Sequence, residues 1–205
     1  MTLLQKTRYN AIVKETKDLL LAKGIDGVTM ADIASHLSIG EASLYRYFGT
    51  KQSLVIEAAI LIWQDVYEIL EKRPLKSTGY ENLKSFYGFF LETFQEHPEF
   101  FSLVEEFYVK IVQSNMSCEE LQEYEETILK FKGVFDRFFA MGVADGTVKK
   151  RVERDIFYYT TNHALISLCK KLATQSHILA YETQMAEITQ IQCLIDICLY
   201  YIKNT

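Results

Sequence analysis

The chain has 205 residues, of which 49% are hydrophobic and 24% are charged, and its formal net charge is −5. This length suits one large domain or two small ones with a real core, and the composition excludes both a disordered chain and an all-apolar membrane protein. Only two prolines and nine glycines interrupt the chain, which disfavours a sandwich or barrel of many short strands. At first sight the net charge also argues against a nucleic-acid partner.

The cysteines, the histidines and the first residues give no sign of a disulfide framework, a metal site or an export signal. The four cysteines lack CxxC spacing and lie in apolar contexts, so we expect reduced, buried thiols. The four histidines lack ligand spacing, and we expect neither a metal nor another cofactor. No apolar run approaches the roughly 20 residues that span a bilayer, and residues 1–6 lack a secretory pattern. We therefore expect a cytoplasmic protein with no membrane partner.

The first quarter of the chain predicts three helices separated by tight turns. Apolar residues at three-and-four spacing over residues 9–20 predict an amphipathic helix capped by Gly24. Thr29, three residues before Asp32, approximates a capping box and predicts the start of a short second helix. After a turn, residues 41–47 predict a third helix, also short.

The remainder predicts longer helices and an all-α fold. A fourth helix is expected from residue 50 or 53 to about residue 72, followed by helices over roughly 78–97, 98–114, 117–142, 152–176 and 182–203. Charge divides the chain unevenly. Residues 1–52 hold seven Lys/Arg and five Asp/Glu, a net +2, whereas residues 53–205 hold fifteen and twenty-two, a net −7. The whole-chain charge therefore hides a mildly basic N-terminal part.

The second and third predicted helices have the proportions of a helix-turn-helix, in which the second short helix enters the major groove of DNA. Small side chains on the third helix would allow close approach, and its tyrosine hydroxyls and arginine could bond phosphate or base edges. The residues expected to contact DNA are Thr29, Glu41, Ala42, Ser43, Tyr45, Arg46, Tyr47 and Lys51. By periodicity alone, a small three-helix domain that half-buries Tyr45 and Tyr47 remains an equal alternative.

Three sequence elements in residues 24–54 are specific in combination: Asp-Ile-Ala at 32–34, Leu-Tyr-x-Tyr-Phe at 44–48 and x-Lys-x-x-Leu at 50–54. This stretch closely resembles the N-terminal signature of TetR-type (tetracycline-repressor-like) transcriptional regulators. The resemblance implies phosphate contacts from Thr29, Tyr47 and Lys51. It also implies that Glu41, Ala42, Ser43, Tyr45 and Arg46 lie on the base-facing or flanking part of the recognition helix.

The chain departs from that family's pattern at three positions. Ser38 stands where the turn usually has glycine, and Gly40 stands where a serine often caps the recognition helix. Glu41 stands where a lysine, arginine or glutamine is more usual. Its carboxylate is either a solvated charge at the helix start or the acceptor of a hydrogen bond from a cytosine N4 amine.

Aromatic residues gather in the middle of the chain, where nine of the 27 lie between Phe86 and Tyr108. They predict either an aromatic-rich core or an apolar cavity for a ligand. The TetR-type resemblance implies a small-molecule effector pocket in this part of the chain, and the aromatics suggest a lipophilic or flat effector. The residues proposed to line it are Trp63, Tyr67, Phe90, Phe94, Phe107, Tyr108, Phe138 and His163.

The last predicted helix carries a heptad-like apolar stripe, and the helix before it offers a second one. The residues of this predicted seam are Ala164, Leu168, Leu172, Ile188, Ile191, Ile195, Cys198 and Ile202. The stripes can be buried within one chain or can meet a second copy in a four-helix bundle. The resemblance favours the homodimer, whose recognition helices, about 34 Å apart, would read a near-palindromic operator in double-stranded DNA.

Taken together, these patterns predict a helix-turn-helix DNA-binding domain over residues 1–52 and an effector-binding and dimerisation domain over residues 53–205. The expected function is that of a ligand-responsive transcriptional regulator, a repressor released from its operator by a small, largely apolar effector. An enzyme is one alternative, with His163 and either Glu105 or Glu106 as a general base. A helical protein-interaction module is the other.

Overall fold

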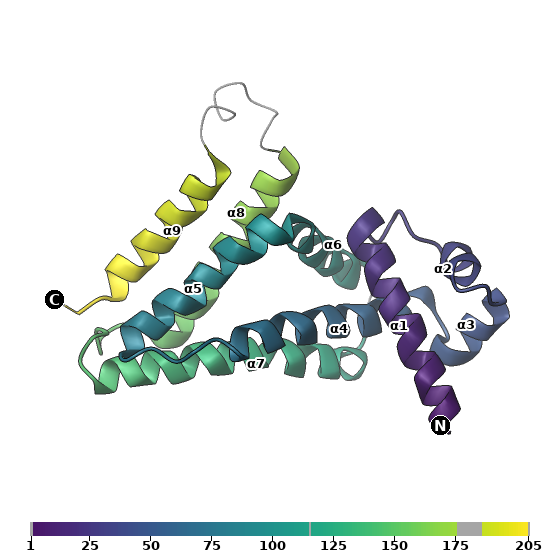
Figure 1. The fold of residues 1–205 in the computed structure, drawn as a ribbon, viewed down its shortest axis with the longest axis horizontal. Coiled ribbons are helices and arrows are strands. Elements are labelled where there is room, and N and C mark those ends of the chain that lie inside the picture. Colours follow the sequence, from purple (N-terminus) through teal and green to yellow (C-terminus); the bar gives the residue numbers. More distant parts are fainter. Residues whose placement is uncertain (1, 115, 176–185, 205) are drawn as a thin grey trace. The chain divides into compact units, whose positions relative to one another are not determined.

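In the computed structural model, the described residues are 2–114, 116–175 and 186–204, and they form nine α-helices (Figure 1). The helices are α1 (Leu3–Lys23), α2 (Met30–His36), α3 (Glu41–Phe48), α4 (Lys51–Glu71), α5 (Gly79–Glu96), α6 (Pro98–Ser114), α7 (Cys118–Ala144), α8 (Arg154–Gln175) and α9 (Glu187–Ile202). The predicted all-α fold is confirmed. The predicted last helix over 182–203 starts later, at Glu187, and residues 182–185 lie outside the described residues.

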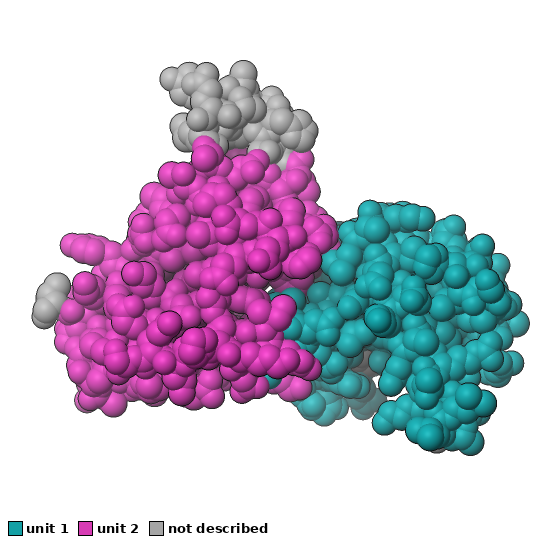
Figure 2. All heavy atoms as spheres, viewed as in Figure 1, with its two compact units in different colours: residues 1–67, 106–128 teal, residues 68–105, 129–205 magenta. Residues whose placement is uncertain are grey.

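The chain divides into two compact units, coloured separately in Figure 2. Unit 1 comprises residues 1–67 and 106–128, and unit 2 comprises residues 68–105 and 129–205. Helices α4, α6 and α7 each contribute residues to both units. This division by packing does not coincide with the functional boundary expected between residues 52 and 53, which stays a prediction.

Unit 1 has an aliphatic core that fixes the short helices. Ile12 and Leu20 of α1, Ile33 of α2, Leu44 of α3 and Leu54 of α4 are each at most 1% exposed. Burying aliphatic side chains of this size stabilises the fold by roughly 1.5–3 kcal/mol each. Two helices as short as α2 and α3 have too few internal hydrogen bonds to persist alone, so this packing holds them in place.

Unit 2 has a largely aromatic core, in which α5, α8 and α9 pack on one another. Phe86 and Tyr87 of α5 and Phe135 of α7 are buried, and the Tyr87 hydroxyl lies 2.8 Å from Thr161 Oγ1. At the start of α5 the chain approaches the end of α7 so closely that a Cβ at Gly79 would lie 1.9 Å from the Gly142 nitrogen. Glycine is therefore required where these two helices meet.

The cysteines only partly match the expectation of buried thiols. Cys169 and Cys198 are buried, and burial raises the pKa of the Cys169 thiol to about 12. Cys193, in contrast, is exposed on α9, because the buried stripe of that helix lies on its other side. The side chain of Cys118 lies outside the described residues.

Among the described residues, no helix combines the length and the apolar character that crossing a membrane requires.

Candidate nucleic-acid interface

The start of α2 is fixed by the capping box that the sequence predicts. The Asp32 amide donates to Thr29 Oγ1 (3.1 Å), and the Thr29 amide donates to Asp32 Oδ2 (2.8 Å). The Thr29 hydroxyl also lies 2.5 Å from the same Asp32 oxygen, and these bonds to Thr29 lower the pKa of the Asp32 carboxyl. Thr29 is exposed, so a DNA phosphate could reach it, but only in competition with Asp32.

The turn between α2 and α3 places Ser38 in the left-handed region, with φ of 53°. The Ile39 amide donates to the Ala34 carbonyl and the Ser38 amide to the Ser35 carbonyl, the pair of bonds that defines a Schellman motif. The residue at the left-handed position of this motif is most often glycine. The expected departure from the family's pattern is therefore real, and the turn accommodates a serine side chain.

Helix α3 turns one face inward and leaves the other open. Leu44 and Phe48 are buried, whereas most of the residues predicted to read DNA are exposed or half-buried on the remaining surface. The exposed ones are Glu41, Ala42, Tyr45 and Arg46, and the half-buried ones are Ser43 and Tyr47. Tyr45 is 49% exposed, which agrees with a groove-facing position rather than a core one.

Arg46 is held near the middle of this open face by its neighbours on α3. Its Nη2 lies 3.4 Å from Ser43 Oγ, and its guanidinium carbon lies 5.9 Å from the centre of the Tyr47 ring. These contacts, a long hydrogen bond and a cation–π arrangement, restrict the side chain while leaving its donors accessible. A guanidinium in this position can pair with a guanine edge or a phosphate.

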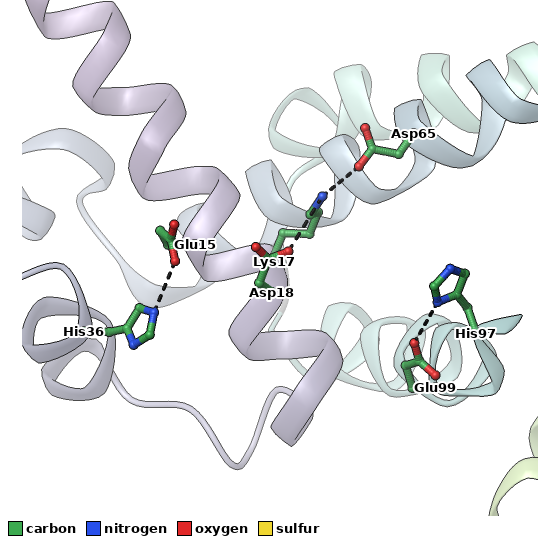
Figure 3. A network of polar contacts seen from close by, with 7 residues as sticks. All are labelled: Glu15, Lys17, Asp18, His36, Asp65, His97 and Glu99. Carbon is green, nitrogen blue, oxygen red and sulfur yellow. Dashed lines mark hydrogen bonds and ion pairs between the residues drawn. The ribbon is translucent and has the colours of Figure 1, made fainter.

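Helix α1 supports the two short helices from behind. The rings of Tyr9 and Phe48 lie 4.7 Å apart, which ties α1 to the end of α3. His36 Nε2 of α2 lies 3.2 Å from Glu15 Oε2 of α1, and Lys17 Nζ of α1 lies 2.8 Å from Asp65 Oδ2 of α4 (Figure 3). The recognition helix is thereby fixed on a framework of three other helices of unit 1.

Lys51 has a partner that the sequence does not predict. Its Nζ donates to the main-chain carbonyl of Ile25 (2.7 Å), in the loop between α1 and α2. The side chain is half-buried, so the lysine helps to hold the helix-turn-helix together. Its contact with a DNA phosphate stays a prediction, and that contact would have to compete with Ile25.

Glu106 of α6 has a structural role in unit 1, whereas the sequence suggests it only as a possible catalytic base. Its two carboxylate oxygens accept hydrogen bonds from the Ile25 and Asp26 amides, each 3.0 Å long. About 80 residues separate the partners. No local pattern could signal such a contact, because it depends on how α6 packs against the loop.

Comparison with known proteins agrees with this geometry. Residues 12–58 match the model of the family described as bacterial regulatory proteins, tetR family. Comparison with curated proteins yields no significant match. The family match and the exposed face of α3 together indicate a helix-turn-helix of the tetR type in this part of the chain.

Similar solved structures extend the likeness to nearly the whole chain. A regulator from Saccharomonospora viridis in complex with choline is 15% identical with a TM-score of 0.72, and the match covers 98% of this chain and 100% of that one. PfmR from Thermus thermophilus is 19% identical with a TM-score of 0.63, and the match covers 92% of this chain and 97% of that one. FadR from Bacillus subtilis in complex with stearoyl-CoA is 14% identical with a TM-score of 0.62, and the match covers 93% of this chain and 97% of that one. At these identities the likeness concerns the fold. Residues 12–58 thus match the N-terminal domain of the tetR family, and the chain as a whole has the fold of solved tetR-family regulators.

The residues predicted to line an effector pocket fall into both units. Trp63, Tyr67, Phe107 and Tyr108 belong to unit 1, and Phe90, Phe94, Phe138 and His163 belong to unit 2. In unit 1, Trp63 Nε1 donates to the hydroxyl of buried Tyr124 (3.2 Å), and the Phe107 ring lies 4.5 Å from the Tyr124 ring.

In unit 2, Phe90 and Phe94 both contact the ring of Phe101, whereas His163 is exposed. Most of these aromatics thus have core contacts, which is the alternative that the sequence left open. Their role in binding an effector stays a prediction.

The predicted dimer seam is mostly buried within the single chain. Its buried members are Leu172, Ile191, Ile195, Cys198 and Ile202, its half-buried members are Leu168 and Ile188, and Ala164 is exposed. The physical reason is that α9 packs on α5 and α8 of its own unit. An apolar heptad stripe has the same pattern whether it meets its own chain or another. A second copy would therefore have to contact side chains outside the buried part of this stripe.

Proposed function

We propose that this regulator is a ligand-responsive repressor that binds a near-palindromic operator as a homodimer and leaves it when an effector binds. The single observation that carries the DNA-binding part is the open face of α3, on which Arg46 is oriented and two small residues, Ala42 and Ser43, permit close approach. This action would take place in the cytoplasm, where the DNA is.

The outer face of α8 and α9 supports the homodimer. An open groove on α9 is lined by residues that include Ile188, Cys193, Ile197 and Tyr200. On α8, Ile156 is 69% exposed and Tyr159 is 45% exposed. Exposed apolar side chains of this kind favour association with a partner. We propose that a second copy covers this face, in place of the buried stripe that the sequence suggests.

An effector is supported by the solved regulators of similar fold, which hold choline in one case and stearoyl-CoA in another. In a two-state mechanism the ligand shifts the equilibrium only by its differential affinity for the DNA-bound and free conformers. The effector must then lower DNA affinity by the same factor by which DNA lowers effector affinity. Equilibrium titrations in both orders test this, and unequal factors would exclude the mechanism.

Selection of bound sites from random double-stranded DNA by the purified protein tests the proposal as a whole. We expect recovered sites with two inverted half-sites whose centres are about one helical turn apart. Transcription in vitro from a promoter that overlaps such a site should then fall on adding the protein. Failure to enrich any sequence would exclude operator binding, and increased transcription would exclude repression.

The enzyme alternative receives no support from the placement of its proposed residues. His163 is exposed on α8, Glu105 forms an ion pair with Lys170 (3.0 Å), and Glu106 holds the loop between α1 and α2. A general base needs to reach its substrate's proton directly or through one water, and none of these contacts indicates a substrate site.

A further inference from the structure

The loop that leads from α1 into α2 (residues 24–29) is held by charged side chains from two other helices of unit 1. The amides of Ile25 and Asp26 in this loop donate to Glu106 of α6. In addition, Asp26 Oδ1 lies 2.7 Å from the Nζ of Lys110, which is also on α6. The Ile25 carbonyl accepts the bond from Lys51 of α4. Charge-assisted bonds of this kind are stronger than neutral ones, so α4 and α6 together fix the entry to the helix-turn-helix.

Gly24 makes this arrangement possible. Its φ of 71° lies in the left-handed region, and a Cβ there would lie 2.9 Å from Glu106 Oε2. Any larger residue would strain the backbone and press against the carboxylate that holds the loop. The loop, the glycine and the carboxylate therefore form one fitted unit.

A cavity of about 280 Å³ lies beside these tethers, within unit 1. Its apolar walls come from the start of α4 and the second half of α6, and they include Val55, Ile56, Phe107 and Ile111. Its charged groups are the two ammonium groups of Lys51 and Lys110 and the single carboxylate of Asp26. The lining therefore has a net charge of +1 and an apolar interior.

We propose that this cavity binds a small organic monocarboxylate with an apolar body, whose carboxylate replaces Asp26 as the partner of Lys110. The volume corresponds to roughly nine water-sized groups, which suits benzoate or hexanoate. The apolar body would displace water from the walls of α4 and α6, and the carboxylate would be paired with an ammonium group already in place.

Binding there acts directly on the DNA-reading part of the chain. When the carboxylate takes Lys110, the ion pair that ties Asp26 to α6 is lost, and the loop at the base of α2 is held by fewer bonds. This step rests on the proposed function, and of the aromatic residues that the sequence suggests for an effector pocket, only Phe107 lines this cavity.

Calorimetric titration of the full chain with benzoate and hexanoate, and with the neutral benzamide and hexanamide, tests the ligand class at low ionic strength. We expect saturable binding of the acids, about tenfold or more weaker binding of the amides, and a comparable loss for Lys110→Gln, because a bond to a charged group is removed in each case. Lys14→Gln, the same charge change at an exposed position of α1, should bind the acids as the natural chain does.

Isoleucine methyl NMR locates the bound acid independently of the affinity. We expect saturable shifts at Ile25, Ile56 and Ile111, which line the cavity, and none at exposed Ile156 of unit 2. Equal binding of acids and amides, unchanged binding by Lys110→Gln, shifts confined to unit 2, or no binding of either acid at millimolar concentration would each overturn the proposal.

The operator selected by the natural chain separates this inference from the proposed function. We expect benzoate or hexanoate to weaken operator binding by the natural chain and to have at least tenfold less effect on Lys110→Gln. If no operator is found while the acids bind at the isoleucines of the cavity, the proposed function fails and the ligand site stands. If the operator is found but the acids do not bind, the site fails alone.

Discussion

Ser38 is a serine in a backbone conformation that costs an L-residue free energy. Its φ of 53° places it in the left-handed region, where the cost is roughly 1–2 kcal/mol. Glycine avoids that cost but loses about 0.4–1 kcal/mol more conformational freedom on folding. We therefore expect Ser38→Gly to raise the free energy of unfolding by roughly 0.5–1 kcal/mol, measured by urea denaturation.

The reverse substitution provides the control. Gly49 has φ of 72° and open space where a Cβ would be, so Gly49→Ala introduces backbone strain without a steric clash. We expect it to destabilise the chain by roughly 1–2 kcal/mol. A Ser38→Gly variant that is less stable than the natural chain would mean that the serine side chain itself stabilises the turn.

Glu41 places a carboxylate at the start of α3, where it either reads a base or only repels phosphate. It is exposed on the first turn of the recognition helix. If it accepts a hydrogen bond from a cytosine N4 amine, Glu41→Ala should reduce discrimination at one base pair by roughly 1–3 kcal/mol. Site selection with the variant measures this. Equally tighter binding to all sequences would instead show that the residue acts by repulsion alone.

Glu57 of α4 is a carboxyl whose pKa is raised, first by burial and also by the charge of Glu123, despite a hydrogen bond from Tyr9. The folded chain therefore binds a proton at Glu57 more tightly than the unfolded chain does. As the pH rises from the ordinary pKa of a glutamate, 4.5, to the raised pKa of Glu57, the stabilisation that this proton provides is lost. Above that window the cost of the half-buried charge is fully present. We expect Glu57→Gln to be more stable than the natural chain at pH 7.

The advantage of Glu57→Gln should shrink as the pH is lowered towards 4, where the natural carboxyl is protonated. Thermal unfolding of both chains between pH 4 and pH 8 measures it. Glu125→Gln removes a charge at an exposed position of α7 and serves as the control. A constant difference across the range would show that Glu57 does not titrate differently in the folded chain.

At the scale of helices, the sequence predicts those features whose cause is local. The capping box at Thr29, the glycine that ends α1 and the turn at Ser38 each depend on neighbours within five residues, and the structure contains all three. Helix starts are predicted less well, since α1 begins at Leu3, before the apolar stripe over residues 9–20, and α9 begins only at Glu187. The exposed face of α3 could be predicted because its buried residues, Leu44 and Phe48, are spaced by one helical turn.

Contacts between distant helices could not be predicted in this way. The apolar stripe of α9 indicates that a partner exists but not that the partner is α5 and α8 of the same chain. The sequence predicts that Lys51 contacts phosphate, but it could not predict the hydrogen bond from Lys51 to the Ile25 carbonyl. Likewise, a carboxylate such as Glu106 has no pattern that marks the loop it binds, because the partner amides are main-chain groups present at every position.

The meeting of α5 with α7 in unit 2 gives a prediction at this scale. A Cβ at Gly79 would lie 1.9 Å from the Gly142 nitrogen, a main-chain atom that cannot move without displacing α7. The Gly79 amide also donates to Asp145 Oδ2 (2.7 Å), which fixes the same approach. We expect Gly79→Ala to destabilise the chain by roughly 2 kcal/mol or more, since overpacking at a rigid contact typically costs about 1–3 kcal/mol.

Gly88→Ala, in the middle of α5, is the matched control. Nothing lies within 4 Å of a Cβ built there, so only helix propensity changes. Alanine is favoured over glycine in a helix interior by about 0.8–1 kcal/mol, and this variant should be more stable by that amount. Urea denaturation distinguishes the two. If both alanines had the same effect, the contact between α5 and α7 would not be rigid.

Across the whole molecule, charge is distributed so that DNA binding depends more on fit than on electrostatics. Residues 1–52 have a net charge of only +2, and Arg46 is the only lysine or arginine between residues 29 and 50. Of the nearby lysines, Lys17 pairs with Asp65 and Lys51 donates to Ile25. The remaining 153 residues carry a net charge of −7, and this charge repels the DNA duplex. Only the part of the chain that contains the recognition helix has a net positive charge.

This distribution predicts a weak dependence of operator affinity on salt. Each phosphate that a cation neutralises contributes about −0.9 to the slope of log affinity against log salt concentration. With Arg46 and Lys51 of two chains as the phosphate partners, we expect a slope of roughly −2 to −4, against about −10 for a strongly basic repressor. Fluorescence anisotropy with a labelled operator at several salt concentrations measures this slope.

The variant Arg46→Gln shows which group the arginine binds. It should make the slope shallower by about 2 if the arginine binds phosphate, and it should leave the slope unchanged if the arginine binds a base. A slope near −10 would instead mean that cations outside α2 and α3, such as those of α1, carry the binding.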